Sequence, residues 1–186
     1  MKRIQCYAFI VLTAFTLSCF SGQARAESSG QFYMLGGWKF SSEDTKPNSG
    51  SIHVGANIDY ILPPKTRTNL FVGLEGEAGH LFDSATVNGY ETDFGLDYAF
   101  FLRAGVKTQG NPLTIYAKAG YGQTHIKRTS ATERISQFDG GLRGGGGAEY
   151  RVPNFHLSLR ADYTYIFYNE REGKTHLFRV GVSFPF

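Results

Sequence analysis

The stretch HLFRVGVSFPF, residues 176–186, decides the fold. From Phe178 onward every second residue is large and apolar, and the residues between are mostly small or polar. Successive side chains of a β-strand point to opposite faces, so the stretch predicts a strand with one apolar and one polar face. At the edge of a soluble sheet such a strand invites aggregation, whereas in a barrel it is paired on both sides. A membrane-embedded barrel is therefore the hypothesis tested on the remaining sequence.

The first 26 residues have the anatomy of a secretory signal peptide. Lys2 and Arg3 give a basic start, residues 7–20 form an apolar stretch too short to span a membrane, and residues 24–26 offer an A-x-A cleavage site. The alternatives are an uncleaved anchor or a lipoprotein signal ending at Cys19. We expect cleavage after residue 26, which leaves residues 27–186 as one domain.

Removal of this segment changes what charge and cysteine content imply. The net charge of +3 comes from Lys2, Arg3 and Arg25, so residues 27–186 carry equal numbers of acidic and basic side chains. The basic balance of the whole chain is therefore no argument for binding nucleic acid. Both cysteines, Cys6 and Cys19, also lie in the expected signal peptide. A disulfide scaffold and a thiolate metal site are thereby excluded for the exported domain.

Eight segments of alternating apolar and polar residues follow, separated by turn-forming residues. They are residues 31–40, 51–62, 69–81, 92–107, 113–126, 136–150, 155–167 and 176–186. The connections after the second, fourth and sixth segments look short, and the others look longer and more polar. This predicts an all-β fold, an eight-stranded antiparallel up-and-down transmembrane β-barrel. The glycine run at residues 144–147 is expected to make room for long interior side chains or to permit a bend.

The direction of the two faces separates a membrane barrel from a soluble one. The polar face carries charges of both signs from all eight segments, the apolar face carries aromatic residues near strand ends, and the glycines lie mainly on the polar face. These features favour lipid outside and charges inside. Because buried charges require partners, we expect an interior ion network that closes the barrel rather than a conducting pore. The expected members are Glu75, Glu77, Arg103, Lys118, Arg143, Arg160, Asp162 and Arg179.

The segments RADYTYIF (residues 160–167) and FRVGVSFPF (residues 178–186) resemble the last hairpin of the OmpA-like and opacity-type outer-membrane barrels, a porin-related family of Gram-negative bacteria. The resemblance implies an outer-membrane location with external loops and periplasmic termini. It also implies that Phe186, with Phe184, is read by the outer-membrane assembly machinery. A host or matrix ligand is suggested by the resemblance alone. Pro185 departs from the family's pattern, and we expect the end of this strand to pair poorly because proline lacks an N–H.

Candidate chemistry on the barrel is sparse. His156, Ser158 and Glu170 have a spacing similar to that of a lipid A deacylase family, but the strand pattern places Glu170 at the opposite end, so we expect no enzyme. The loop with Lys127, Arg128 and Arg134 either contacts lipopolysaccharide phosphates or is an ordinary solvated loop.

The sequence gives no reason to expect a cofactor, and the scattered histidines are not expected to bind metal. The functional hypothesis is a monomeric outer-membrane barrel with a plugged lumen and a structural or surface-interaction role. The alternatives are a small-solute pore and an enzyme acting on lipid A.

Overall fold

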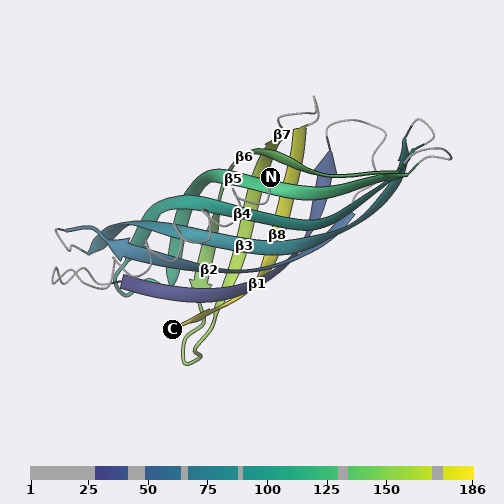
Figure 1. The fold of residues 1–186 in the computed structure, drawn as a ribbon. Coiled ribbons are helices and arrows are strands. Elements are labelled where there is room, and N and C mark those ends of the chain that lie inside the picture. The colour runs from purple at the N-terminus through teal and green to yellow at the C-terminus, as the bar shows by residue number, and fades with distance from the viewer. Residues whose placement is uncertain (1–27, 42–48, 64–66, 88–89, 130–133, 169–173) are drawn as a thin grey trace.

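The computed structural model describes residues 28–41, 49–63, 67–87, 90–129, 134–168 and 174–186. The expected signal peptide and Glu170 lie outside these residues. Eight strands run through the described part, each hydrogen-bonded to the next, and the sheet closes on itself. They are β1 (Ser28–Ser41), β2 (Ser49–Ile61), β3 (Thr68–Val87), β4 (Tyr90–Thr108), β5 (Leu113–Thr129), β6 (Arg134–Arg151), β7 (Ser158–Tyr168) and β8 (Lys174–Pro185). The predicted eight-stranded antiparallel barrel is confirmed (Figure 1).

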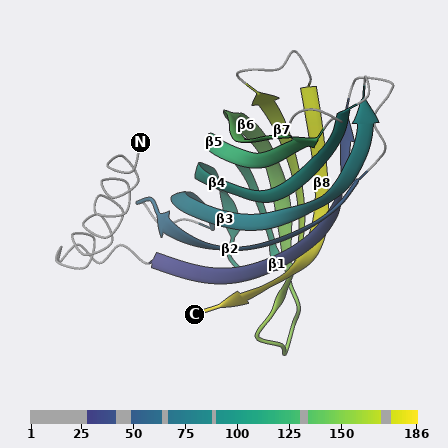
Figure 2. The same ribbon diagram turned by 45° about the vertical axis from the view of Figure 1, so that its right-hand side comes forward.

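The barrel closes where β8 returns to β1. The two strands pair from Gln31 opposite Pro185 to Ser41 opposite Thr175, and they lie side by side in both ribbon views (Figures 1 and 2). The expectation that Pro185 weakens this end is wrong: the Phe186 N–H donates a hydrogen bond to the Gly30 carbonyl at 3.0 Å. The phenyl ring of Phe186 also packs on Phe32, with ring centroids 4.4 Å apart. Proline is tolerated because ladder pairing resumes at the following residue.

The hairpin of β3 and β4 is much longer than the sequence predicts. Residues 82–91 were expected to form a loop, yet β3 reaches Val87 and β4 begins at Tyr90. The pairing shifts register between His80 and Asp83, and β4 shifts against β5 between Phe94 and Asp97. A β-bulge inserts an extra residue and reverses the alternation beyond it. Because β3 ends at Val87 and β4 begins at Tyr90, their connection is shorter than the one between β4 and β5. The expectation that the connections after β1, β3, β5 and β7 are the longer ones is therefore wrong for this hairpin.

The apolar row of every strand faces outward. Phe178 and Val180 of β8 are each 46% exposed, and Leu102 of β4 is 68% exposed, whereas Arg179 is fully buried. The expected arrangement, with apolar side chains outside and charges inside, is confirmed. Within the described residues no helix is long and apolar enough to cross a membrane.

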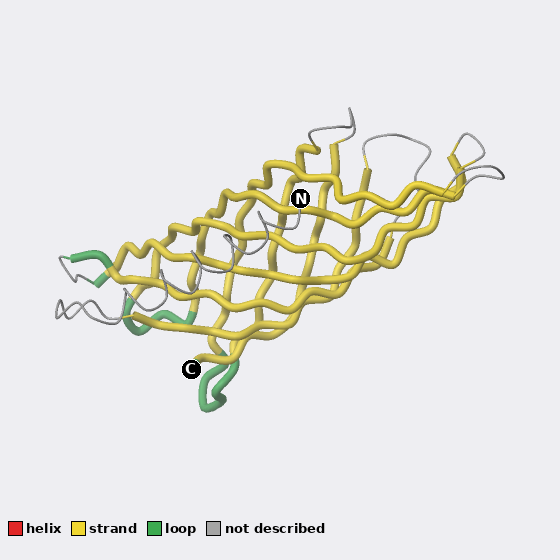
Figure 3. The backbone as a smooth tube through the Cα atoms, viewed as in Figure 1, coloured by secondary structure: helices red, strands yellow, loops and turns green. Residues whose placement is uncertain are grey.

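One end of the barrel carries all of the described turns. The tube view shows these turns, in green, gathered at the end where Phe186 lies (Figure 3). They connect β2 to β3, β4 to β5 and β6 to β7. Asn154, in the last of them, has a φ of 65°, a left-handed conformation that asparagine tolerates better than most residues. This end is called the turn end below, and the opposite end is called the hairpin end.

Candidate functional site

The barrel interior holds a dense group of ion pairs centred on Glu75 of β3. Its two carboxylate oxygens accept hydrogen bonds from Arg160 at 2.8 and 2.9 Å. Lys118 lies 2.8 Å from one oxygen, and Arg103 lies 3.1 Å from the other. Three cations from β4, β5 and β7 therefore surround one buried carboxylate. Charge-assisted hydrogen bonds of this kind are stronger than neutral ones, which compensates part of the cost of burying the charges.

A second centre lies at Asp162 of β7. Arg179 of β8 contacts it at 2.6 Å, Lys118 at 2.9 Å and Arg160 at 3.1 Å. Arg179 also reaches Glu77 of β3 at 2.9 Å. Because Lys118 and Arg160 bind both Glu75 and Asp162, the two centres form one continuous network. The structure thus brings seven of the eight expected interior residues into direct contact with one another.

The eighth expected residue, Arg143, lies in a neighbouring group. Its terminal nitrogens bind both carboxylate oxygens of Asp97, at 2.7 and 2.8 Å. Thr124 donates a hydrogen bond to the same carboxylate at 2.6 Å. The Nδ1 atom of His53 lies 3.9 Å from Asp97. This group comes from β2, β4, β5 and β6.

The network extends beyond the residues that the sequence singles out. Arg103 contacts Asp59 of β2 and Glu149 of β6, both at 3.2 Å. Both acids lie on the predicted polar face, so alternation alone could have nominated them. With Asp59 and Glu149 included, the network of ion pairs, called the lumen network below, joins β2 to β8.

Buried aromatic rings separate and cover these charges, a feature that the sequence reading missed. The Arg160 guanidinium lies 4.0 Å from the centroid of the Tyr33 ring, and that of Arg103 lies 4.1 Å from the Tyr116 ring. Lys118 lies 4.3 Å from the Phe101 ring. Cations are attracted to aromatic faces, most strongly away from water. Tyr33 lies on β1, so all eight strands contribute side chains to this interior group.

A vestibule opens at the turn end of the barrel. It has a volume of about 370 Å³, and its lining includes Asn69, Lys107, Arg151 and Glu149. Glu149 is also an ion-pair partner of Arg103 and Arg160. The vestibule therefore reaches inward as far as a member of the lumen network.

The basic residues expected to contact lipopolysaccharide lie at the hairpin end. They are not all in a loop: β5 continues to Thr129 and β6 begins at Arg134. Lys127 and Arg134 are exposed, and their partners across the two strands are Ser136 and Thr129. For Arg128 only the backbone, opposite Ile135, is described.

The residues considered for a lipid A deacylase do not form a site within the described part of the chain. His156 is exposed in the turn before β7, and Ser158 is a buried residue at the start of that strand. Glu170 lies outside the described residues. The sequence argument against this triad therefore stays a prediction.

Comparison with known proteins agrees with the geometry. The family described as the outer membrane protein beta-barrel domain matches residues 10–186. The chain belongs to this family. This outer-membrane barrel is 31% identical over 114 residues to the 25 kDa outer-membrane immunogenic protein of Brucella ovis; the match covers 61% of the chain and 55% of that relative, so it spans only about half of the relative's length.

Solved structures share the fold with this outer-membrane barrel at low sequence identity. Ail, the attachment invasion locus protein of Yersinia pestis, in complex with the heparin analogue sucrose octasulfate, has a TM-score of 0.56 and 15% identity, covering 87% of this chain and 99% of Ail. The outer-membrane enzyme PagL has a TM-score of 0.50 and 12% identity, covering 83% and 99% of the two chains. The fold thus occurs in an attachment protein and in an enzyme, so it does not by itself assign a role.

Proposed function

We propose that this chain is a monomeric, non-conducting outer-membrane barrel with a structural or surface-interaction role. Residues 1–26 are removed as a signal peptide, the turn end and both termini face the periplasm, and the hairpin end faces outward. The observation that carries the proposal is the lumen network, in which the charged side chains are buried and bound to partners on other strands.

The geometry favours a plug over a pore. Arg103, Arg160 and Arg179 are each at most 2% exposed, so they offer little accessible charge to a passing ion. Each of these arginines contacts the carboxylates of at least two residues. Separating buried ion-pair partners is costly in free energy. The interior of an eight-stranded barrel is only just wide enough for packed side chains. We infer that the vestibule at the turn end is closed by the network and does not continue across the membrane.

Planar-bilayer conductance tests this proposal. Purified wild-type protein should give no stable single-channel current. The double variant Arg103→Ala, Arg160→Ala, which removes two large side chains next to the vestibule, should show open events if it still folds. Leu102→Ala, a truncation on the outer face, is the matched control and should stay closed. A stable wild-type current that lumen substitutions abolish would overturn the plug and favour the pore.

A surface role is supported by the exposed pair Lys127 and Arg134 at the hairpin end. Two cations on adjacent strands suit phosphate or sulfate groups, such as those of lipopolysaccharide or a sulfated host polysaccharide. The complex of Ail with a heparin analogue shows that one barrel of this fold is compatible with a sulfated ligand. We expect Lys127→Ala, Arg134→Ala to weaken binding of sulfated glycans, lipopolysaccharide or both, measured separately. Lys107→Ala, at the turn end, is the control that should bind normally.

We infer that the chain has no catalytic role in lipid A modification. This inference is supported by the different environments of two candidate residues. His156 is exposed in a turn, whereas Ser158 is buried in the wall of the barrel. Mass spectrometry of lipid A from cells with and without the protein tests this directly. A change in acylation that Ser158→Ala abolishes would establish an enzyme instead.

A further inference from the structure

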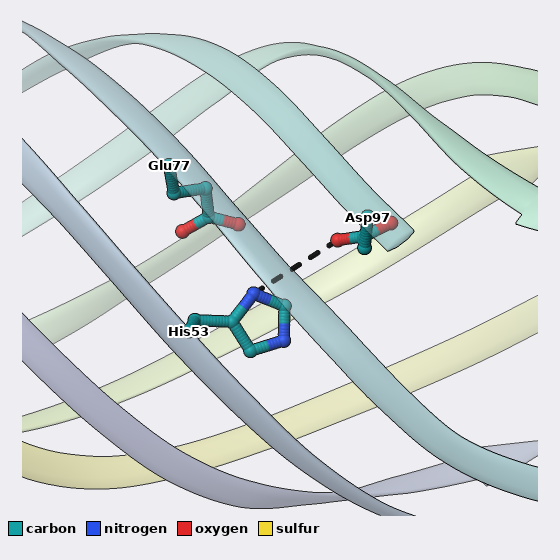
Figure 4. A group of neighbouring side chains, drawn as sticks. All are labelled: His53, Glu77 and Asp97. Carbon is teal, nitrogen blue, oxygen red and sulfur yellow. Dashed lines mark ion pairs between the residues drawn. The ribbon is translucent and has the colours of Figure 1, made fainter. Parts of the chain in front are cut away.

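At the border of the lumen network three side chains converge, of which only Glu77 also belongs to that network. They are His53 of β2, Glu77 of β3 and Asp97 of β4, and they point toward one another (Figure 4). One ligand atom from each residue lies within 4.8 Å of the others. All three residues are buried, and His53 is 0% exposed.

The sheet register explains why these side chains meet. His53 pairs with Gly79, and Gly79 pairs with Asp97, so the three residues lie in one row across β2, β3 and β4. A Cβ atom at Gly79 would lie 2.4 Å from the His53 Nδ1 atom. Because Gly79 has no side chain, the imidazole of His53 can occupy the space over β3, between β2 and β4. Glu77, two residues earlier on β3, faces the same interior side and borders this space.

His53 is the observation that points to a ligand. Neither of its ring nitrogens makes a hydrogen bond in the structure, although both are buried. The contact of 3.9 Å between Nδ1 and the Asp97 carboxylate is too long to be a hydrogen bond. Buried polar atoms in native proteins nearly always have a partner, so an imidazole aimed at two carboxylates without one is unusual.

The buried charges of the interior nearly balance without an added ion. The buried acids in the described part of the chain are Asp59, Glu75, Glu77, Asp97, Asp139, Glu149 and Asp162, and the buried bases are Lys39, Arg103, Lys118, Arg143, Arg160 and Arg179. With His53 neutral, the acids exceed the bases by one. A divalent ion would turn this excess of one negative charge into an excess of one positive charge, so the count alone does not favour a bound ion.

We propose that His53, Glu77 and Asp97 bind a single divalent transition-metal ion of the Zn²⁺ or Co²⁺ class. An imidazole with two carboxylates is a donor set that such ions accept, with bonds of about 2.0–2.2 Å. Arg143 holds both oxygens of Asp97, and Arg179 holds one oxygen of Glu77 at 2.9 Å. These arginines orient the two carboxylates, as outer-shell partners do in metal sites. The ion would tie three consecutive strands together inside the barrel.

Metal binding by untagged protein, purified from outer membranes in detergent, tests the proposal. The protein is unfolded in urea with chelator, freed of chelator, and refolded with Co²⁺. We expect one Co²⁺ per chain by elemental analysis, with visible ligand-field absorption. His53→Gln should reduce the affinity at least tenfold. The matched control replaces the other four histidines, His80, His125, His156 and His176, by glutamine and should retain the ion.

A second variant guards against loss of folding in His53→Gln. Gly79→Ala keeps all three ligands, but its methyl group would meet the imidazole and, at 2.6 Å, the Ile52 carbonyl oxygen, so the folded fraction of this variant should also lose Co²⁺. Folding of each variant is checked by its heat-modifiable mobility on gels. Absence of stoichiometric Co²⁺ from the folded wild type would overturn the proposal. Equal binding by folded wild type and folded His53→Gln would do so as well.

Discussion

The buried guanidinium of Arg179 shows what a single interior residue does in this barrel. Its two terminal nitrogens bind Glu77 of β3 at 2.9 Å and Asp162 of β7 at 2.6 Å. Removing one partner of a buried ion pair leaves the other charge in a poorly solvated place, which typically costs about 3–5 kcal/mol. We expect Arg179→Met, which keeps most of the volume, to lower the free energy of unfolding by about that amount.

Urea unfolding in detergent micelles measures this loss, with the fluorescence of Trp38, the one tryptophan of the chain, as the signal. Arg67→Met is the control because Arg67 is exposed in the turn between β2 and β3, and it should change stability by less than about 0.5 kcal/mol. Similar losses in the two variants would mean that the interior pairs contribute no more than a surface charge.

Alternation in the sequence predicts which residues face the interior, but it does not predict which of them form ion pairs with one another. Arg160 and Glu75 are 85 residues apart in sequence, and their contact depends on the stagger of strands across the closed barrel. The aromatic rings of Tyr33 and Phe101 were missed for a related reason. On a polar row they look like exceptions, and only the closed structure shows them lying against Arg160 and Lys118.

At the level of strands, the sequence predicts the number and order of the strands correctly but misplaces some of their ends. Alternation located all eight strands, since each has one face toward lipid and one toward the packed interior. It stopped too early in β3 and began too late in β4, because bulges near His80 and Phe94 reverse the pattern. Asp93 demonstrates the reversal: uninterrupted alternation from buried Asp97 predicts that Asp93 faces the interior, yet Asp93 is exposed and lies opposite exposed Lys127.

The glycine run of β6 offers a matched pair of substitutions. A Cβ at Gly145 would lie 2.0 Å from the Tyr163 carbonyl oxygen on β7, whereas a Cβ at Gly144 meets nothing within 4 Å. Gly145→Ala should therefore force the backbones apart and destabilise by about 1–3 kcal/mol. Gly144→Ala should be neutral or stabilising by up to about 1 kcal/mol, since glycine is unfavourable within a strand. Equal urea midpoints for the two variants would contradict this assignment of the close approach.

The end of β8 carries the proposed assembly signal, and its contacts with β1 suggest how to separate assembly from stability. Phe186→Ala removes the ring that packs on Phe32 and Gly30. We expect a several-fold drop in folded protein in the outer membrane of cells, with refolding in detergent much less affected. The control is Phe155→Ala, which truncates an equally exposed ring in a turn. If detergent refolding fell as much as cellular assembly, the ring would be a closing contact and not a signal.

For the molecule as a whole, the surface decides where the barrel resides. Large apolar side chains on all eight strands are more than one-third exposed, while the charges of the lumen network lie inside. In water this arrangement would expose far more contiguous apolar surface than soluble proteins tolerate. In lipid the same surface is solvated, and closure leaves no strand edge unpaired. The stability of the barrel should therefore depend on the solvent that its outer face meets.

A charge on the outer wall tests this dependence. Leu102 is 68% exposed and lies beside Leu74 and Ala119 in the sheet, next to Arg103 of the lumen network. An arginine facing the middle of a bilayer destabilises a barrel by about 2–4 kcal/mol. Leu102→Arg should therefore lower the unfolding free energy in lipid vesicles by that amount. Phe155→Arg, in the turn between β6 and β7, should have little effect because the headgroups and water can solvate its charge. An unchanged unfolding free energy in Leu102→Arg would mean that this wall faces water, because exposed positions of soluble proteins accept arginine. That result would contradict the membrane assignment.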